Sequence, residues 1–162
     1  FTDICNALDE GNTVLLGLLD LSAAFDTIDY DILLSRLEVS FGIVGPVLIW
    51  FKSYLTDRSQ SVRISGCYSA NLRYGVPQGS VLGPLLFILY IAPLLQIIHR
   101  HGLQGHCYAD DTQVYFCCAP DQMSIFATTL SACIVELQQW MSANRLKLNC
   151  DKTEVLCLSS RG

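Results

Sequence analysis

Hydrophobic residues recur along this chain with two different periods, which divide the sequence into short helices and strands. The run 14–19 is continuously apolar and ends at Asp20, which is typical of a strand buried on both faces. Apolar residues then recur at helical spacing over 28–41, and we expect Asp26 to cap that helix. Asp29 would add a favourable negative charge near the same positive helix end. The N-terminal part of the chain therefore predicts a buried strand followed by a helix.

A second helix and a hairpin are predicted next. Pro46 suits a first helical turn, and the apolar stripe after it predicts a helix that stops near Asp57. That stripe comprises Val47, Trp50, Phe51, Tyr54 and Leu55. Over 60–74 apolar residues alternate around Ser65 and Gly66, which predicts a β-hairpin.

The region 75–83 is rich in Gly and Pro and predicts a binding loop. A helix over 84–99 should follow it, with Ser80 as the expected cap. The segment 81–98 is almost wholly apolar, but it contains two prolines and is shorter than the ~20 residues that cross a bilayer. We therefore expect a buried helix and no membrane partner.

The C-terminal half predicts more strands and one more helix. A hairpin is expected over 103–118, a helix opened by Asp121 over 121–140, and two short strands over 146–158 around a turn at Asp151 and Lys152. Together these elements predict an α+β fold, in which an antiparallel sheet carries helices packed mainly on one face.

Composition narrows the class of protein. The 162 residues fit one domain, and 51% hydrophobic with 15% charged residues excludes a disordered segment. The net charge is −5, and the chain has only ten Lys and Arg, too few to bind phosphates strongly. Most contacts to a nucleic acid would therefore lie outside this chain. Because the sequence starts mid-pattern at Phe1, we expect a piece of a longer protein.

Cysteines and histidines do not predict a metal site. The eight cysteines show no Cys-x-x-Cys spacing and fall mostly within apolar runs, so we expect small buried side chains in a reduced intracellular protein. His99, His101 and His106 lack a fourth ligand at zinc spacing and are expected at helix ends and in loops.

Two adjacent carboxylates, Asp110 and Asp111, lie at the predicted tip of the 103–118 hairpin, where a turn brings both side chains to one place. A lone Asp-Asp pair is usually a surface turn. Asp20 changes that interpretation, because a buried strand ending in an acid can lie beside this hairpin in one sheet. Three converging carboxylates indicate a divalent metal, and two Mg²⁺ ions ~4 Å apart form a centre for phosphoryl or nucleotidyl transfer.

Three stretches resemble, in order, motifs A, B and C of reverse transcriptases, most closely those of non-LTR (LINE-type) retrotransposons. They read LDLSAAFD over 19–26, GVPQGSVLGPLLF over 75–87 and YADD over 108–111. The stretches 50–55 with Arg58, and 146–149 with Lys152 and Thr153, also look like that family. Three long motifs in one order are far more specific than any one alone.

The resemblance implies a polymerase palm over 1–162 carrying motifs A to D, without the N-terminal part of the fingers, the thumb and the endonuclease. It implies an RNA-directed DNA polymerase that adds deoxynucleoside triphosphates (dNTPs) to a DNA 3′-hydroxyl on an RNA template, by two-metal in-line attack. Asp20, Asp110 and Asp111 would be the catalytic metal ligands, joined by the backbone carbonyl of Leu21. The ions would be two Mg²⁺, with Mn²⁺ as a substitute.

The same resemblance implies a nucleotide site. Its residues would be Leu21, Ser22, Ala23, Ala24, Phe25, Gln78, Gly79 and Lys152. Backbone amides of 22–25 would face the triphosphate, and the ring of Phe25 would exclude a 2′-hydroxyl. Gln78 would lie near nucleotide and template, and Lys152 would neutralise or protonate the leaving pyrophosphate. Without the resemblance, Phe25 would be a core residue and Lys152 a solvated turn residue.

Other functions remain open at this level. A catalytically inactive remnant or domesticated fragment would keep the fold and act through binding or have no role. A two-metal nuclease would share the acids but has no need of the motif B loop or of a ring at Phe25. Within an intact element we expect an intracellular protein of nucleus and cytoplasm, whose partners include the RNA template, the DNA primer and the missing fingers and thumb.

Overall fold

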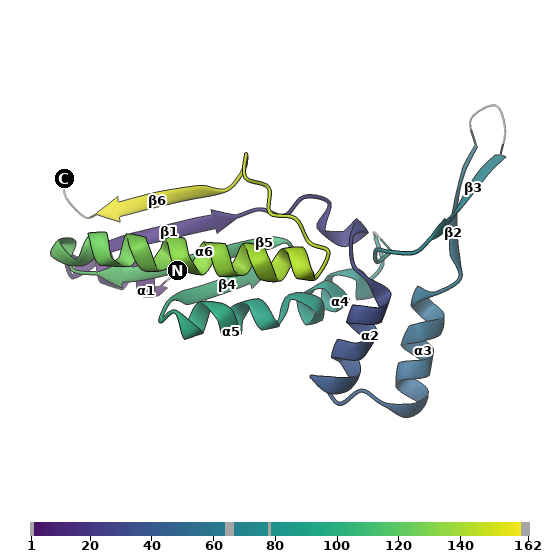
Figure 1. Cartoon of the computed structure of the whole chain (residues 1–162). Coiled ribbons are helices and arrows are strands. Elements are labelled where there is room, and N and C mark those ends of the chain that lie inside the picture. The colour runs from purple at the N-terminus through teal and green to yellow at the C-terminus, as the bar shows by residue number, and fades with distance from the viewer. Residues whose placement is uncertain (1, 64–66, 78, 160–162) are drawn as a thin grey trace. The chain divides into compact units, whose positions relative to one another are not determined.

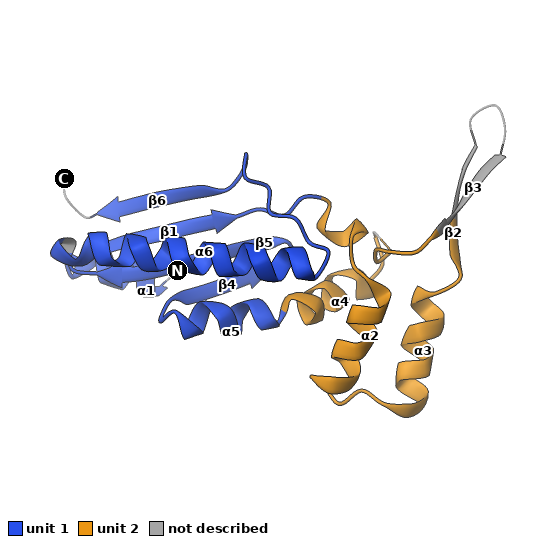
Figure 2. Ribbon diagram, in the orientation of Figure 1, with its two compact units in different colours: residues 1–22, 92–162 blue, residues 23–91 orange. Residues whose placement is uncertain are grey.

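The computed structural model describes residues 2–63, 67–77 and 79–159 (Figure 1). The chain forms two compact units, shown in Figure 2. Unit 1 comprises residues 1–22 and 92–162, and unit 2 comprises residues 23–91.

Unit 1 is built on a four-stranded antiparallel sheet (Figure 1). Its strands are β1 (Thr13–Leu19), β4 (Gln104–Tyr108), β5 (Asp111–Cys118) and β6 (Glu154–Ser159), in the order β4-β5-β1-β6. All but one residue of the central strand β1 are buried, which confirms the strand predicted from its continuous apolar run. The hairpin predicted over 103–118 is confirmed as β4 and β5.

Two helices, α5 (Pro93–Arg100) and α6 (Met123–Ala143), cover one face of this sheet. The rings of Phe116 on β5 and Phe126 on α6 stack with their centroids 3.7 Å apart. A methyl group added at Gly105 of β4 would meet the side chain of Ile98 at 2.8 Å, so α5 lies directly over that strand. Gly105 pairs with Val114, two residues from Phe116, which places both contacts on the same face.

The opposite face of the sheet carries helix α1 (Thr2–Asp9), which was not among the predicted elements. Ile4 and Ala7 of α1 pack against Val14, Leu16 and Tyr115 of the sheet. A helix of 8 residues is too short to be stable alone, so this packing must stabilise it. The prediction of helices mainly on one face is confirmed, with α1 as an addition on the other.

The contact between α1 and the sheet is expected to weaken in alkali. The Tyr115 hydroxyl donates a hydrogen bond of 2.7 Å to the Asp3 carboxylate. Burial, together with this bond, raises the pKa of Tyr115 from 10.0 to about 12. A folded-state pKa above the unfolded value gives stability that is full below pH 10.0 and lost as the pH rises to about 12. We therefore expect the melting temperature of the wild-type chain to fall over this range by more than that of Tyr115→Phe.

Circular dichroism melts at a series of pH values measure this difference. Tyr108→Phe is the control, because Tyr108 is 83% exposed on the same sheet. Equal alkaline losses in wild type and Tyr115→Phe would show that this hydrogen bond does not set the pH dependence.

The helix predicted over 84–99 is two helices, α4 (Leu82–Ile91) and α5, separated at Ala92. Pro93 is the first residue of α5, where its missing amide hydrogen costs nothing and its fixed φ starts a new helix. By length and composition alone, Leu82–Arg100 is the one stretch among the described residues that could cross a membrane. In its most apolar window 44% of the residues are buried.

Unit 2 begins with a short 3₁₀ turn, η1 (Ala24–Asp26), and helix α2 (Tyr30–Val39). The cap of α2 is Asp29 and not Asp26, because Asp29 Oδ1 accepts hydrogen bonds from the amides of Asp31 and Ile32. Asp26 lies inside η1, too far up the chain to reach the first turn. The expectation for Asp26 was therefore wrong by three residues.

Helix α3 (Gly45–Leu55) and a hairpin follow in unit 2. Of the predicted apolar stripe only Leu55 is fully buried, whereas Val47 and Trp50 are more than half exposed. The predicted hairpin is confirmed as the antiparallel pair β2 (Arg58–Arg63) and β3 (Cys67–Leu72), and its turn at 64–66 lies outside the described residues.

The cysteines are less buried than the sequence suggested. Of the seven described, Cys118 and Cys133 are buried, Cys107 and Cys117 are half-buried, and Cys5, Cys150 and Cys157 are exposed; all seven are free. Burial raises the pKa of the Cys133 thiol to about 11. The prediction of small buried side chains therefore holds for only some of them.

Candidate active site

The predicted carboxylates lie at one end of two adjacent strands of unit 1. Asp20 directly follows β1, Asp111 begins β5, and Asp110 lies in the tight turn between β4 and β5. The last pair in the ladder between β1 and β5 joins Leu19 to Thr112, so one further step brings Asp20 opposite Asp111. The sheet thus produces the neighbourhood that the sequence predicted.

Asp20 and Asp111 line a common cavity of about 320 Å³. The cavity is also lined by Leu18, Leu19, Thr112, Gln113 and Lys152. Asp110, in the turn, does not line it, and within the described ranges no three His, Cys, Asp or Glu side chains are grouped closely enough to hold a metal ion. The oxygen donors suit a hard divalent cation, and the structure brings together two of the three predicted ligands.

The segment 147–149, which follows α6, is joined to Asp20 and Ser22 by backbone hydrogen bonds. The amide of Asn149 donates to the carbonyl of Asp20 at 2.9 Å, and the amide of Ser22 donates to the carbonyl of Lys147 at 2.9 Å. These bonds form the isolated antiparallel bridge between Leu21 and Leu148. The strand predicted within 146–150 is therefore wrong, because this segment makes a single bridge and only β6 forms a strand beyond it.

The same bridge bears on two predicted backbone contacts. At a non-hydrogen-bonded position of an antiparallel pair, a residue turns its carbonyl away from its partner strand. The carbonyl of Leu21 therefore points away from Leu148, toward the edge of β1 where β5 lies. The amide of Ser22, by contrast, already donates to Lys147 and is not a free donor for a triphosphate.

Side chains from this segment surround the carboxylate of Asp20. Asn149 Nδ2 donates to Asp20 Oδ2 at 3.0 Å, and Lys152 Nζ lies 3.8 Å from the same oxygen. The side chain of Asp20 is 25% exposed and that of Lys152 is 71% exposed. Lys152 was a predicted site residue. Asn149 was not, although it belongs to the stretch 146–149, which is part of the resemblance described above.

The remaining predicted residues lie in unit 2. Ala23 has a left-handed φ of 50°, and the 3₁₀ turn η1 follows it. A left-handed residue followed by right-handed ones turns successive amides toward one side, which forms a concavity suited to anions. The amides of Ala24 and Phe25 come from this turn. Gln78, the predicted motif B glutamine, lies outside the described residues.

The loop 75–83 runs beside η1 within unit 2. The amide of Val76 donates to the carbonyl of Phe25 at 2.9 Å, and that of Gly75 donates to Ile28 at 2.8 Å. Ser80 caps α4 as predicted, since its Oγ accepts a 3.0 Å hydrogen bond from the amide of Gly83. The loop is thus fixed to η1 at one end and to α4 at the other.

Phe25 packs against a neighbouring ring and also lines a cavity. Its ring packs on Phe87 with centroids 4.9 Å apart, as a core residue would. Phe25 also lines a cavity of about 450 Å³. The cavity is otherwise lined by Pro77, Gly79, Ser80, Val81, Gly83 and Pro84. Phe25 is therefore a half-buried ring that contributes both to packing and to the wall of a cavity.

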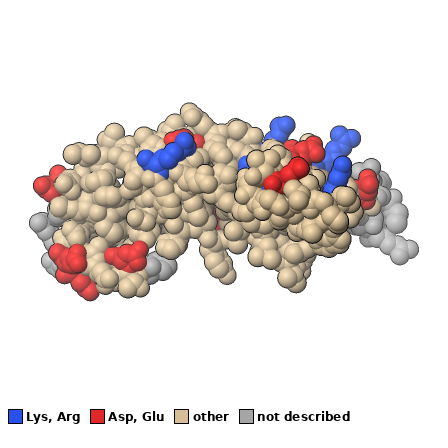
Figure 3. Space-filling view, turned by 90° about the horizontal axis from the view of Figure 1, so that it is seen from below, with Lys and Arg blue, Asp and Glu red and all other residues tan. Residues whose placement is uncertain are grey.

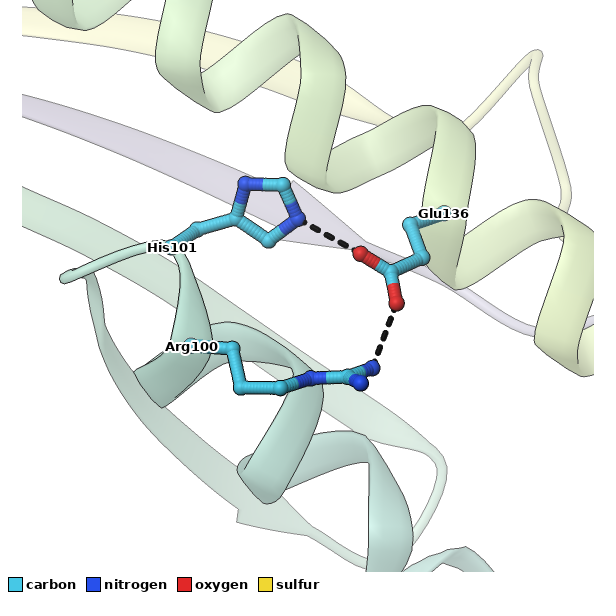
Figure 4. A network of polar contacts seen from close by, with 3 residues as sticks. All are labelled: Arg100, His101 and Glu136. Atoms are coloured by element: carbon cyan, nitrogen blue, oxygen red, sulfur yellow. Dashed lines mark hydrogen bonds and ion pairs between the residues drawn. The ribbon is translucent and has the colours of Figure 1, made fainter.

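Two of the histidines lie at a helix end, as predicted. His99 lies in the last turn of α5, and His101 follows it, where its Nε2 is 2.7 Å from Glu136 Oε2. Arg100 pairs with the other oxygen of Glu136, so α5 and α6 are tied together (Figure 4). His106 lies in β4 rather than in a loop, stacked on Tyr115 with centroids 5.9 Å apart. The pairs at Glu136 link two helices of unit 1.

The sequence is similar to known proteins over nearly its whole length. The sequence matches the reverse transcriptase (RNA-dependent DNA polymerase) family over residues 3–161. It is 34% identical to a probable RNA-directed DNA polymerase from transposon BS of Drosophila melanogaster, over 96% of this chain and 18% of that protein. It is 28% identical to the RNA-directed DNA polymerase from mobile element jockey of the same species, over 96% of this chain and 17% of that protein. The chain thus spans less than a fifth of these relatives.

Solved structures share the fold at low sequence identity. Telomerase from Candida tropicalis, in its apo form truncated from the C-terminal domain, superposes with a TM-score of 0.69 at 15% identity, over 99% of this chain and 34% of that chain. Telomerase from Candida albicans, in complex with a fragment of telomeric RNA, superposes with a TM-score of 0.68 at 14% identity, over 96% and 29%.

Proposed function

Because this chain belongs to the reverse transcriptase (RNA-dependent DNA polymerase) family, we propose that it is the palm of a mobile-element polymerase that copies RNA into DNA. The α+β palm fold expected from the sequence is confirmed by the telomerase neighbours. The observation that carries the proposal is the position of Asp20 and Asp111. Asp20 follows β1, Asp111 begins the neighbouring strand β5, and both line one cavity with Lys152. The reaction is the addition of dNTPs to a DNA 3′-hydroxyl.

The acids are proposed to hold the divalent metal that reverse transcriptases use, as two Mg²⁺ ions or Mn²⁺ in their place. Such ions lower the charge on the attacking and leaving oxygens during in-line displacement. Asp20 and Asp111 supply carboxylate oxygens from the cavity, Asp110 supplies a third from the adjoining turn, and the carbonyl of Leu21 points to the edge of β1 where β5 lies. Lys152 carries the positive charge proposed to meet the leaving pyrophosphate.

In unit 2, the amides of Ala24 and Phe25 are proposed to meet phosphate oxygens, since the left-handed Ala23 forms a concavity of the kind that binds anions. Phe25 is proposed to select deoxyribose, because its ring is held against Phe87 and cannot move aside for a 2′-hydroxyl. Gly79 lines the same cavity as Phe25, and Gln78 keeps its proposed role near the template.

Contacts to template and primer are proposed to come largely from segments outside this chain, the fingers and thumb of a complete polymerase. The whole sequence has ten Lys and Arg against fifteen Asp and Glu. The face in Figure 3 is mostly uncharged, and its few basic side chains do not form a continuous stripe. Phosphate binding needs such a stripe, so this surface would hold nucleic acid only weakly.

The second candidate is a catalytically inactive remnant. It is favoured by one observation, that the described residues contain no group of three metal-ligating side chains. A two-metal nuclease is the third candidate, but nothing in its chemistry calls for the loop 75–83 fixed against Phe25.

Primer extension separates the three candidates. The chain is assayed alone and grafted in place of the corresponding segment of a full-length mobile-element relative, with a labelled DNA primer on an RNA template, dNTPs and Mg²⁺. We expect extension by the graft that stops when EDTA removes the metal. A graft that folds but neither extends nor shortens the primer would establish the remnant, and a shortened primer would establish the nuclease.

A further inference from the structure

The carboxylate of Asp20 is held from one side by the segment that follows α6. Asn149 donates its side-chain amide to Asp20 Oδ2 at 3.0 Å and its backbone amide to the Asp20 carbonyl at 2.9 Å. One residue therefore fixes both the main chain and the side chain of the proposed metal ligand. The other carboxylate oxygen, Oδ1, has no hydrogen-bond partner within the described part of the chain.

Asn149 also fixes the turn that carries Lys152. The carbonyl of Asn149 accepts a hydrogen bond from the Lys152 amide at 3.2 Å and from the Thr153 hydroxyl at 2.8 Å. Lys152 Nζ then approaches the same oxygen of Asp20 that the Asn149 amide contacts. Asn149 is thus the common anchor of the carboxylate and the ammonium group.

The chemistry of an amide suits this place. An uncharged donor restrains the carboxylate without neutralising it, whereas the ammonium group of Lys152 competes with a cation for the same negative charge. Hydrogen bonds to the carboxylates that ligate a metal fix their rotamers and strengthen metal binding. Such partners commonly matter nearly as much as the ligands they orient.

We propose that Asn149 is a positioning residue of the metal site, holding Oδ2 of Asp20 so that Oδ1 is presented to a divalent cation. This inference rests on the proposed function, since it takes Asp20 as a metal ligand. It goes beyond that function because it assigns a residue that neither binds the nucleotide nor ligates the ion. The backbone bond from Asn149 to Asp20 survives any side-chain substitution, so the amide can be tested separately from the fold.

Binding of Mn²⁺ to the purified chain, measured by titration calorimetry, tests the proposal without any polymerase assay. We expect Asn149→Ala to weaken Mn²⁺ affinity by about 10- to 100-fold, the usual loss when a hydrogen-bond partner of a metal ligand is removed. Asp20→Asn is measured beside it and should weaken Mn²⁺ binding at least as much. If Asn149→Ala does not fold, Asn149→Leu replaces it, because Leu fills a similar volume without a donor.

Asn144→Ala is the matched control. Asn144 is buried, and its amide donates to the carbonyl of Trp140 at 2.8 Å, at the end of α6. We expect this variant to lower the melting temperature and to leave Mn²⁺ affinity unchanged, which separates lost stability from lost positioning.

The outcomes distinguish this inference from the proposed function. If Asp20→Asn weakens Mn²⁺ binding and Asn149→Ala does not, Asn149 is only structural and the metal site stands. If the wild-type chain binds no Mn²⁺, or Asp20→Asn leaves binding unchanged, both the positioning role and the metal role of Asp20 are overturned.

Discussion

Replacing Asp20 with Asn in the grafted polymerase is expected to lower primer extension by a factor on the order of 10³, since removing even one group that stabilises transition-state charge costs about 10²–10³. The amide is nearly the same size as the carboxylate but carries no charge to hold a divalent ion. The fold should remain intact, because the lost ion pair is long, at 3.8 Å, and its Lys152 partner is 71% exposed, and such pairs contribute little stability. The backbone bond from Asn149 to residue 20 is also kept.

Single-turnover extension rates at saturating Mg²⁺, with melting temperatures measured in parallel, test this expectation. Asp110→Asn should show a comparable loss, as a second proposed ligand. Asp151→Asn is the matched control, because it removes the same charge from an exposed residue beside Lys152. Extension that survives Asp20→Asn or Asp110→Asn would refute the proposed metal-dependent mechanism.

Gly75→Ala is expected to be the most destabilising small substitution in unit 2, lowering the free energy of unfolding by about 2–4 kcal/mol. Gly75 has a φ of +89°, a conformation that L-residues rarely adopt. A methyl group there would lie 3.0 Å from the Cα of Asp26 and 3.1 Å from the carbonyl oxygen of Phe25. Both are main-chain atoms and cannot rotate away, so the loop 75–83 would be pushed off η1.

Urea denaturation followed by circular dichroism measures this loss. Gly42→Ala is the matched control in the same unit, since Gly42 has a φ of +65° and open space where the methyl group would go. We expect it to cost only about 1–2 kcal/mol, the penalty of the left-handed conformation alone. Equal losses at the two glycines would show that crowding against Phe25 and Asp26 is unimportant.

Elements whose hydrophobic pattern is local were predictable from the sequence. The unbroken apolar run of β1 predicts a buried strand, and the two apolar stretches on either side of Asp110 and Asp111 predict a hairpin with the acids at its turn. Once both elements are strands, the acids at their ends can meet at one end of a sheet. The sequence thus predicted a possible neighbourhood, and the pairing of β1 with β5 places Asp20 opposite Asp111.

Elements that depend on distant partners were not predictable. Helix α1 has apolar residues at helical spacing, but at 8 residues it is too short for that pattern to predict a stable helix, and Ile4 and Ala7 pack on Tyr115, more than a hundred residues away. Asp29 and not Asp26 caps α2 because the chain first forms the turn η1. The spacing of apolar residues does not predict that turn. Asn149 was missed for the same reason, since its importance comes from its contact with Asp20.

The strand predicted within 146–150 failed for a more instructive reason. Its alternation of Leu146 and Leu148 is real, and both side chains are buried. The segment lies beside residues that have already left β1, so it forms a single bridge, between Leu148 and Leu21, before the chain turns back as β6. Alternation reports which side chains are buried but not whether a neighbouring strand extends far enough to pair.

The position of β6 at the outside of the sheet affects how the chain behaves at high concentration. Within the described residues no strand pairs with its outer side, and a strand at the edge of a sheet can pair with a strand of another molecule. Glu154 is its single charged residue, whereas Val155, Leu156 and Cys157 are exposed. Strands with so little charge invite intermolecular pairing, so copies of this chain are expected to self-associate edge to edge as they are concentrated.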